Sequence, residues 1–368
     1  MTSDSSLSLA LQRIRPEVRA MQAYVVQDSA GLLKMDAMEN PFSLPLALQA
    51  ELGQRLGTLP LNRYPGDGVA QLQQALANYV DMPTGCSVVL GNGSDELISL
   101  LALACAQPGA QVLAPIPGFV MYAMSAQLQG LGFVGVPLTP DFALDEAAML
   151  AAIAEHRPAI TYIAYPNNPT ATLWDEAVVQ RIVDAVGAQG GIVAMDEAYQ
   201  PFASRTWLDC MRRDPARNQH VLLMRTLSKF GLAGVRLGYL MGPAALVGEI
   251  DKVRPPYNIS VLNSEAALFA LEHADVFAAQ AAELRAQRTA LIAALRVLPG
   301  IEKCWDSEAN MVLVRVADAA STYAGMKARK VLIKNVSTMH PMLAQCLRLT
   351  VGSADDNARM LAALQDSL

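Results

Sequence analysis

Between Ser87 and Gly242 the chain alternates short apolar runs with longer stretches rich in Ala and Leu. Each run is apolar throughout, rather than at every second residue, which is typical of strands buried on both faces of a parallel sheet. The longer stretches have the composition of helices that cover such a sheet. This alternation predicts an α/β fold with a mostly parallel, doubly wound sheet. We expect its strands at Ser87–Leu90, Gln111–Ala114, Ile160–Tyr165, Gly191–Met195, Val221–Met224 and Arg236–Met241.

The pattern changes after Pro243. The stretch from Asn263 to about Leu298 is rich in Ala, Leu, Glu and Arg and predicts one extended helix. A final helix is expected to open at Ser353 and Asp355. Between these helices we expect short strands at Met311–Val316, Val331–Ile333 and Cys346–Thr350.

A chain of 368 residues is too long for one ordinary core and suggests about two domains. We expect an N-terminal arm at residues 1–35, a large domain at residues 36–260 and a smaller α+β domain at residues 261–368.

Charge and cysteine usage exclude several classes of protein. The net charge is −6 and the chain has no basic run, which argues against partners such as nucleic acid or an anionic membrane surface. No apolar stretch approaches the roughly 18 residues of a membrane span, and the first residues do not resemble a secretory signal. The five cysteines lack the spacing of a disulfide framework or a zinc site. We therefore expect a cytoplasmic protein without a bound metal.

The sequence TLSK at residues 226–229 directly follows a predicted buried strand. A lysine amine buried at a sheet edge has a lowered pKa and becomes nucleophilic. A surface lysine in a turn is the alternative interpretation. Ser228 and the downstream Arg236 favour the first interpretation, because a hydroxyl and a guanidinium beside a Gly-rich loop suit a phosphate.

Two further motifs also follow predicted strands. The sequence DEAY at residues 196–199 places a carboxylate, Asp196, at the end of a strand, although an Asp there could simply cap a helix. The sequence NNPT at residues 167–170 combines a rigid turn with amide donors, of which Asn168 is one, although a tight turn alone has this composition.

The sequence GNGSDE at residues 91–96 lies between a predicted strand and a helix. Backbone N–H groups at a helix N-terminus bind phosphate, so Gly93, Ser94 and Asp95 are candidate phosphate-binding residues. Helix capping by Ser94 and Asp95 is the alternative. All four motifs fall at the carboxyl ends of strands, where open α/β sheets bind ligands, and therefore predict one shared site.

In this order, the four motifs resemble those of fold-type I pyridoxal-phosphate enzymes of the class I and II aminotransferase group, and the resemblance covers essentially the whole chain. It implies that Lys229 binds the cofactor as a Schiff base and moves the proton between Cα and C4′. Asp196 would pair with the pyridine nitrogen, and Phe119 would stack on the ring, with core packing as the alternative. Two residues would contact the ring oxygen, Tyr199 and Asn168. The phosphate would be held by Gly93, Ser94, Asp95, Ser228 and Arg236.

Within this group the chain most resembles the histidinol-phosphate aminotransferases. The resemblance rests on Tyr24 and on NRYP at 62–65, MENP at 38–41, SEAN at 307–310 and CLRLTVG at 346–352.

This resemblance implies roles in substrate binding. Arg348 would meet the anionic end of the substrate, unless it forms an ordinary surface ion pair. Tyr64 would reach the cofactor phosphate and substrate of a neighbouring subunit, which implies a homodimer, unless it lies in a mere exposed loop. Tyr24 would close over the substrate, and Asn168 would also contact it. Lys334 stands where a second substrate-binding arginine is often found.

The sequence departs from the family pattern at a few positions. Ala171 stands where NNPT usually continues with Gly, and Met38 replaces a polar residue common before Glu-Asn-Pro. The interval from Lys229 to Arg236 is one residue shorter than in some relatives, so that loop is expected to be reshaped.

We therefore expect an aminotransferase that uses pyridoxal phosphate and small-molecule substrates, an amino donor and a 2-oxo acid. The substrates implied are histidinol phosphate and 2-oxoglutarate, giving imidazole acetol phosphate and glutamate in histidine biosynthesis. Four alternatives stay open. They are an aromatic-amino-acid aminotransferase, a decarboxylase of a phosphorylated amino acid, a non-catalytic cofactor-binding regulator, and an unrelated α/β protein whose motifs are only turns.

Overall fold

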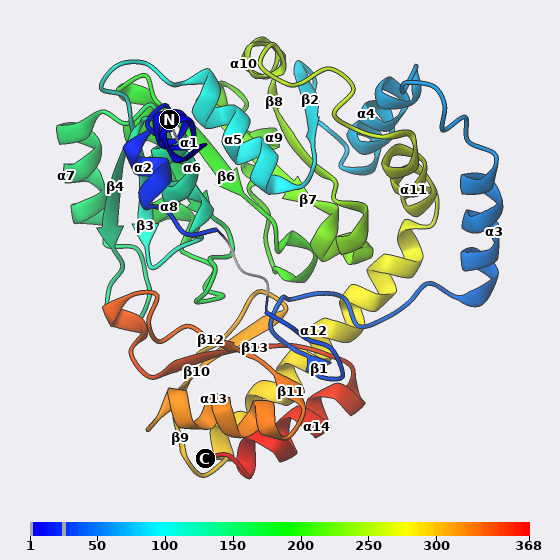
Figure 1. Cartoon of the computed structure of the whole chain (residues 1–368), viewed down its shortest axis with the longest axis vertical. Helices are drawn as coiled ribbons and strands as arrows, with labels where there is room; N and C mark the ends of the chain where they lie inside the picture. The colour runs from blue at the N-terminus through cyan, green and yellow to red at the C-terminus, as the bar shows by residue number, and fades with distance from the viewer. Residues whose placement is uncertain (1–2, 24–26) are drawn as a thin grey trace.

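The computed structural model describes residues 3–23 and 27–368, and its larger part is built on a seven-stranded sheet (Figure 1). The spatial order of the strands is β2-β8-β7-β6-β5-β3-β4. Strand β8 runs antiparallel to both its neighbours, and the remaining pairs are parallel. The predicted mostly parallel α/β sheet is confirmed. Its strands are β2 (Cys86–Gly91), β3 (Gln111–Ile116), β4 (Gly132–Pro137), β5 (Ile160–Ala164), β6 (Ile192–Asp196), β7 (Val221–Thr226) and β8 (Gly238–Pro243).

All six strands predicted in this region are present, with small differences at their ends. The expected start of the last one at Arg236 is wrong. Arg236 has a left-handed backbone (φ 55°), which cannot continue a strand, so β8 begins at Gly238. Strand β4 was not predicted, because Gly132, Gly135 and Pro137 give it the composition of a loop.

Two layers of helices cover the sheet, and side chains alternate between them along each strand. Val88 and Leu90 pack in one core and Val89 packs in the other. One layer consists of α5 (Ser94–Ala104), α6 (Met121–Gln129) and α10 (Ala244–Asp251). The other consists of α4 (Gly68–Tyr79), α7 (Glu146–His156), α8 (Glu176–Ala188), α9 (Trp207–Arg213) and α11 (Val261–Glu272), with α3 (Leu46–Gly57) packed against α11 at the edge of the molecule.

The carboxyl-terminal part forms a second core around an antiparallel sheet of order β12-β13-β10-β9, which lies at the bottom of Figure 1. Its strands are β9 (Ile301–Cys304), β10 (Met311–Val316), β12 (Lys334–Asn335) and β13 (Cys346–Thr350). The helices that pack on it are α12 (Ala274–Val297), α13 (Ala319–Ala328) and α14 (Ala354–Gln365). Ser353 caps α14 and forms a capping box with Asp356.

The prediction of one helix from Asn263 to Leu298 is wrong. Helix α11 ends at Glu272, and α12 starts at Ala274 after His273 leaves the helical conformation (φ −111°, ψ 34°). No Gly or Pro marks this break in the sequence. We attribute the change of direction to packing, because Phe269 is buried in the core and its ring centre lies 4.5 Å from that of His273.

The N-terminal segment spans both parts of the molecule. Between helices α1 (Ser3–Leu11) and α2 (Pro16–Ala20), Arg15 donates to the carbonyl oxygen of Leu128 in α6. In the smaller part, β1 (Leu33–Lys34) pairs in parallel with β11 (Val331–Leu332). The division into domains at residues 35 and 260 stays a prediction. Among the described residues, no helix has the length and apolar character needed to cross a membrane.

Candidate active site

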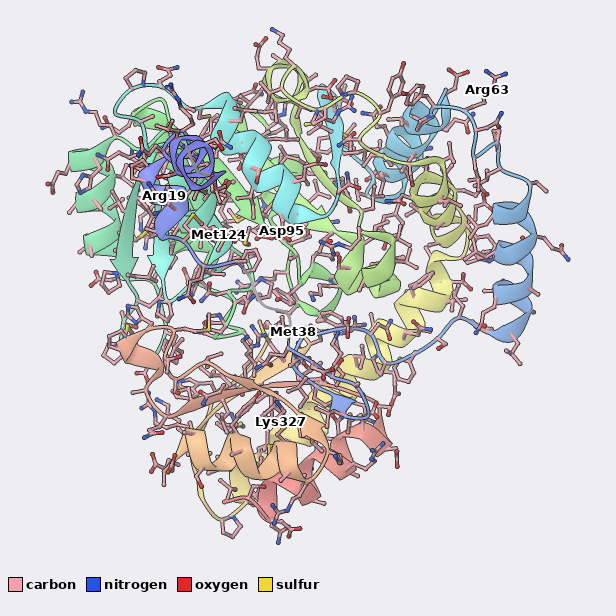
Figure 2. All side chains as sticks on the ribbon, in the orientation of Figure 1. Arg19, Met38, Arg63, Asp95, Met124 and Lys327 are labelled. Atoms are coloured by element: carbon pink, nitrogen blue, oxygen red, sulfur yellow. The ribbon has the colours of Figure 1, made fainter. Side chains whose placement is uncertain are left out.

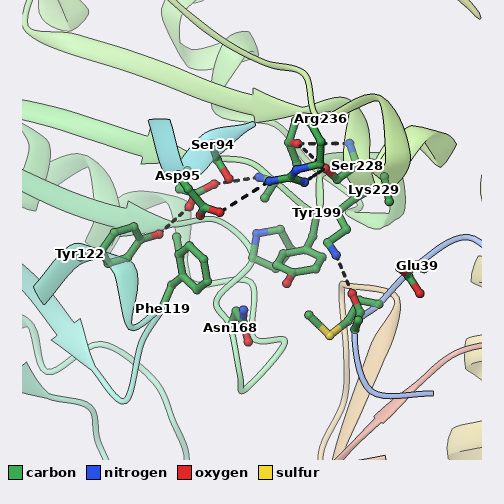
Figure 3. Close-up of a pocket in the computed structure, with 18 of the residues that line it drawn as sticks. Glu39, Ser94, Asp95, Phe119, Tyr122, Asn168, Tyr199, Ser228, Lys229 and Arg236 are labelled. Carbon is green, nitrogen blue, oxygen red and sulfur yellow. Dashed lines mark hydrogen bonds and ion pairs between the residues drawn. The ribbon is translucent and has the colours of Figure 1, made fainter. Parts of the chain in front are cut away.

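A cavity of about 390 Å³ opens where strands β2, β5, β6 and β7 end, and it faces the segment 37–39 that follows β1 (Figure 3). The structure brings nine of the predicted site residues together on its wall. They are Ser94, Asp95, Phe119, Asn168, Asp196, Tyr199, Ser228, Lys229 and Arg236. Four sequence motifs that lie far apart in the chain therefore share one site, as the sheet-edge argument predicts.

Lys229 projects into this cavity from a turn of irregular helix, Ser228–Leu232, that follows β7. Its Nζ donates a hydrogen bond of 2.7 Å to the carbonyl oxygen of Ala37 and lies 6.0 Å from the ring centre of Tyr199. Burial, together with the positive charge of Arg348, lowers the pKa of Lys229 from 10.5 to about 8. About a tenth of the amine is therefore neutral and nucleophilic at pH 7, far more than for an exposed lysine.

Asp196 is the last residue of β6 and is buried at the floor of the cavity. Burial raises the pKa of its carboxyl from 3.8 to about 6. One oxygen accepts a hydrogen bond from the backbone N–H of Ala198 at 3.0 Å, and the other accepts from Tyr122 Oη at 2.6 Å. The helix-cap alternative is wrong, because the helical turn that follows begins at Gln200 and has Tyr199 in the cap position.

The N-terminus of α5 faces the cavity through Ser94 and Asp95. The cap residue is Gly93, with φ 80°, and no side chain caps the helix. The capping alternative for Ser94 and Asp95 is therefore wrong, and the first N–H groups of α5 are free of side-chain caps. A Cβ at Gly93 would lie 2.8 Å from Arg236 Nη2, and one at Gly238 would lie 2.9 Å from the backbone nitrogen of Ser94. Both glycines let the helix end approach Arg236 and β8 closely.

Ser228 and Arg236 lie opposite this helix end. Arg236 Nη1 donates to Ser228 Oγ at 3.2 Å, and Arg236 Nη2 lies 3.7 Å from a carboxylate oxygen of Asp95. Thr226 Oγ1 accepts from the backbone N–H of Ser228 and contacts its hydroxyl. A helix N-terminus, two hydroxyls and one guanidinium thus line the same corner, which is a suitable environment for a phosphate dianion.

Asn168 lies on the opposite wall, and Arg348 fixes its orientation. Arg348 Nη1 donates to Asn168 Oδ1 at 2.7 Å, while Nη2 donates to the carbonyl oxygen of Asp36 at 2.8 Å. With its oxygen occupied in this way, Asn168 presents its NH₂ group as a donor. Arg348 is buried, so the surface ion-pair alternative is wrong. Lys334 is half-buried and directly opposite Arg348 in the β12–β13 ladder, which puts both cations on one face of the sheet.

At two positions where the sequence departs from the family pattern, the residue has a left-handed backbone conformation. Ala171 has φ 59° and is fully buried, and Met38 has φ 52°. Glycine, or a short polar residue, adopts this conformation at lower cost than Ala or Met. Met38 is held in it from both sides, because its N–H donates to Thr350 Oγ1 and its carbonyl accepts from Asn310 Nδ2. The two replacements therefore carry backbone strain next to the cavity.

Two further residues of the cavity wall and one residue that lies elsewhere complete the predicted set. Tyr199 is buried beside Lys229, and Phe119 is half-buried with its edge toward Tyr122. Tyr64 is 78% exposed and stacks on Tyr257, away from this cavity. Figure 2 shows the neighbouring Arg63 at the outer edge of the molecule, far from Asp95 and Met38. Tyr24 lies outside the described residues.

The sequence reasoning missed Tyr122 and Thr226, which both line the cavity. Thr226 was within the TLSK motif and could have been included, because it ends a strand directly before Ser228. Tyr122 lies in helix α6, in a run of small and apolar residues that carries no recognisable motif.

A buried ion pair lies directly behind the site. Arg225 donates to Glu197 from Nε and Nη2 at 3.0 and 2.8 Å. At the start of α9, the hydroxyl of Thr206 and the backbone N–H of Trp207 also donate to Glu197. The Glu197 side chain is fully buried and that of Arg225 is 9% exposed. Because Glu197 follows Asp196 and Arg225 precedes Thr226, the pair ties the ends of β6 and β7 together.

Comparison with known proteins places this site in context. Residues 32–364 match the family described as aminotransferase class I and II. The chain is 78% identical over its full length to the full-length histidinol-phosphate aminotransferase of Acidovorax sp. (strain JS42). It is 76% identical, over 99% of both chains, to the histidinol-phosphate aminotransferase of Paracidovorax citrulli (strain AAC00-1). The crystal structure of histidinol-phosphate aminotransferase from Sinorhizobium meliloti in complex with pyridoxal-5'-phosphate has the same fold, with a TM-score of 0.79 at 22% identity, covering 96% of this chain and 97% of that one.

Proposed function

This chain belongs to the aminotransferase class I and II family, and we propose that it transfers an amino group between histidinol phosphate and 2-oxoglutarate. The products are imidazole acetol phosphate and glutamate, and the reaction is a step of histidine biosynthesis. The relatives named above, whose full lengths this chain matches at 76–78% identity, support this choice of substrate.

The residues of the cavity fit pyridoxal phosphate. A lysine amine with a pKa of about 8, a buried carboxylate and a phosphate-binding corner line one space of about 390 Å³. When bound, this cofactor supplies an electron sink for the carbanion that forms at the substrate Cα. In our proposal Lys229 holds it covalently, Asp196 faces its ring nitrogen, and Phe119 packs on its ring. Tyr199 and Asn168 face the ring oxygen, and Gly93, Ser94, Asp95, Ser228 and Arg236 surround its phosphate.

The amine of Lys229 is also the group best placed to move a proton. Its Nζ takes the proton from the Cα of the amino donor, and its pKa near 8 lets it act both as base and as acid near neutral pH. Tyr199 and the segment 37–39 enclose the amine, so bulk water is largely excluded from the reacting atoms.

Arg348 and Lys334 give the substrate pocket its charge. Both cations lie on one face of the β12–β13 ladder, and Arg348 is buried at the side of the cavity next to Asn168. A guanidinium binds carboxylate and phosphate with two parallel hydrogen bonds. The same residue can thus bind the phosphate of histidinol phosphate in one half-reaction and a carboxylate of glutamate in the other.

We further propose a homodimer with shared active sites. Tyr64 and Tyr257 form a stacked aromatic pair, with ring centres 4.6 Å apart, although they are 78% and 56% exposed. Exposed aromatic side chains of this kind favour a protein interface. Tyr64 would then reach the cofactor phosphate of the neighbouring subunit. The five free cysteines support a reducing, cytoplasmic location.

The substrate is tested by measuring glutamate formed from histidinol phosphate and 2-oxoglutarate by the purified enzyme. Tyrosine and phenylalanine serve as competing donors, and carbon dioxide release is measured in parallel with a phosphorylated amino acid, O-phosphothreonine, which has the carboxylate that histidinol phosphate lacks. The proposal predicts that histidinol phosphate gives the highest kcat/KM and that the phosphorylated amino acid releases no carbon dioxide. A higher kcat/KM for an aromatic amino acid, or stoichiometric carbon dioxide, would overturn the choice of substrate or of reaction.

A further inference from the structure

The hydroxyl of Tyr122 makes the shortest side-chain contact to the carboxylate of Asp196. Tyr122 lies in α6 and Asp196 at the end of β6, and Tyr122 Oη donates to Asp196 Oδ2 at 2.6 Å. Both residues are buried, and both line the cavity. Figure 3 shows the Tyr122 ring reaching the floor of the cavity beside Phe119. A hydrogen bond to a carboxylate in such surroundings is stronger than one in water.

The ring of Tyr122 has little freedom to turn away. It stacks on Tyr162 with ring centres 4.2 Å apart and an angle of 6° between the planes, and it meets Phe119 edge-on at 5.6 Å. Burial, together with the nearby Asp196 charge, raises the pKa of Tyr122 well above its ordinary value. The phenol therefore keeps its proton and acts only as a donor to Asp196.

The charged groups around Asp196 make this donor necessary. Burial disfavours the ionised carboxylate, and the negative charges of Asp95 and Glu197 disfavour it further. Only Tyr122 and the N–H of Ala198 donate hydrogen bonds to the Asp196 carboxylate among the described residues. Tyr162 and Tyr199, which also face it, are neutral, since burial raises the pKa of both.

We propose that Tyr122 is a positioning residue that keeps Asp196 ionised and fixes its second oxygen, so that the remaining lone pairs face the ring nitrogen of pyridoxal phosphate. This inference rests on the cofactor assigned above and adds a residue to its binding machinery. Tyr122 acts on the ring nitrogen alone, through Asp196. It makes no difference to the phosphate corner or to Lys229.

The test compares Tyr122→Phe with Tyr162→Phe as a matched control. Both changes remove one buried hydroxyl from the same aromatic stack, but the Tyr162 hydroxyl lies 3.4 Å from the carbonyl oxygen of Ile98 and does not contact Asp196. The dissociation constant is measured by absorption for pyridoxal phosphate and for an analogue with carbon in place of the ring nitrogen. Losing a hydrogen bond to a charged group is expected to weaken binding roughly tenfold to a hundredfold.

Tyr122→Phe is expected to weaken binding of pyridoxal phosphate by this factor, to leave binding of the carbon analogue within about twofold, and to raise the pH above which pyridoxal phosphate binds tightly. Tyr162→Phe is expected to leave the dissociation constants of both ligands unchanged. If Tyr122→Phe weakened the binding of both ligands equally, the role of Tyr122 would be purely structural. If it weakened the binding of neither, the hydrogen bond would be unimportant. Each result overturns the inference. Absence of cofactor binding by the unsubstituted protein would instead contradict the proposed function.

A double-mutant cycle gives a second check that does not depend on activity. In an Asp196→Asn background, Tyr122→Phe is expected to change the affinity for pyridoxal phosphate by less than about twofold, because the charge that it stabilises is gone. An undiminished effect in that background would overturn the inference. Urea unfolding of each cofactor-free variant shows whether the fold is retained.

Discussion

Replacing Lys229 by methionine should stabilise the cofactor-free protein at neutral pH, although it abolishes activity. Burial lowers the pKa of this amine from 10.5 to about 8, so the folded state binds its proton less tightly than the unfolded state does. A shift of this size corresponds to about 3 kcal/mol. Methionine has a similar length and no charge, and it loses the hydrogen bond to Ala37, which contributes about 1 kcal/mol. The expected net gain in unfolding free energy at pH 7 is therefore about 2 kcal/mol.

The pH dependence of this gain follows from the sign of the shift. Below pH 8 the amine is protonated in both states and the folded protein carries the full penalty. The penalty decreases as the pH rises from about 8 to 10.5, where the unfolded chain also loses the proton. The gain from Lys229→Met is thus expected to shrink by about 2 kcal/mol between pH 7 and pH 10.

Urea unfolding of cofactor-free protein at pH 7 and pH 10 measures this difference. Lys327→Met, which changes an exposed lysine, serves as the control and is expected to have little effect at either pH. If Lys229→Met proved neutral or destabilising at pH 7, or if its effect did not vary with pH, the lowered pKa and the nucleophilic amine derived from it would be wrong.

Three further predictions concern residues around the cavity. Glu197→Gln leaves the Arg225 guanidinium buried beside a neutral partner, which should lower the unfolding free energy by about 3 kcal/mol in a urea titration; a change below about 1 kcal/mol would contradict this. Arg348→Lys removes the paired donors, so KM for both substrates should rise roughly tenfold or more in steady-state kinetics, and an unchanged KM would exclude Arg348 from substrate binding. Mixing inactive Tyr64→Ala and Lys229→Ala subunits should restore partial activity, because one site of each mixed dimer is intact, whereas continued inactivity would argue against a shared site.

The sequence was most informative where a buried strand ends in a motif. The apolar runs before residues 91, 165, 196 and 226 predict four strands. A parallel sheet brings the carboxyl ends of its strands to one edge. Local chemistry could thus be assigned without knowledge of the packing. The same rule explains why Lys229 and Asp196, which come from neighbouring strands, were expected together.

The parts that could not be predicted depend on tertiary contacts. The break at His273 and the position of Tyr122 follow from how helices pack, and neither residue carries a local signal. Arg348 could have been a surface residue, and only the place of β13 between β10 and β12 buries it. Capping by Ser94 was a plausible interpretation until the backbone of Gly93 put the cap one residue earlier.

The most direct test of the central claim is an absorption spectrum of the purified protein with pyridoxal phosphate, before and after histidinol phosphate is added, with Lys229→Ala as the control. We predict a visible band from the lysine-bound cofactor that the control lacks and that histidinol phosphate removes. If no such band formed even with added pyridoxal phosphate, or if the control showed the same band, Lys229 would not hold the cofactor and the proposed enzyme mechanism would be contradicted.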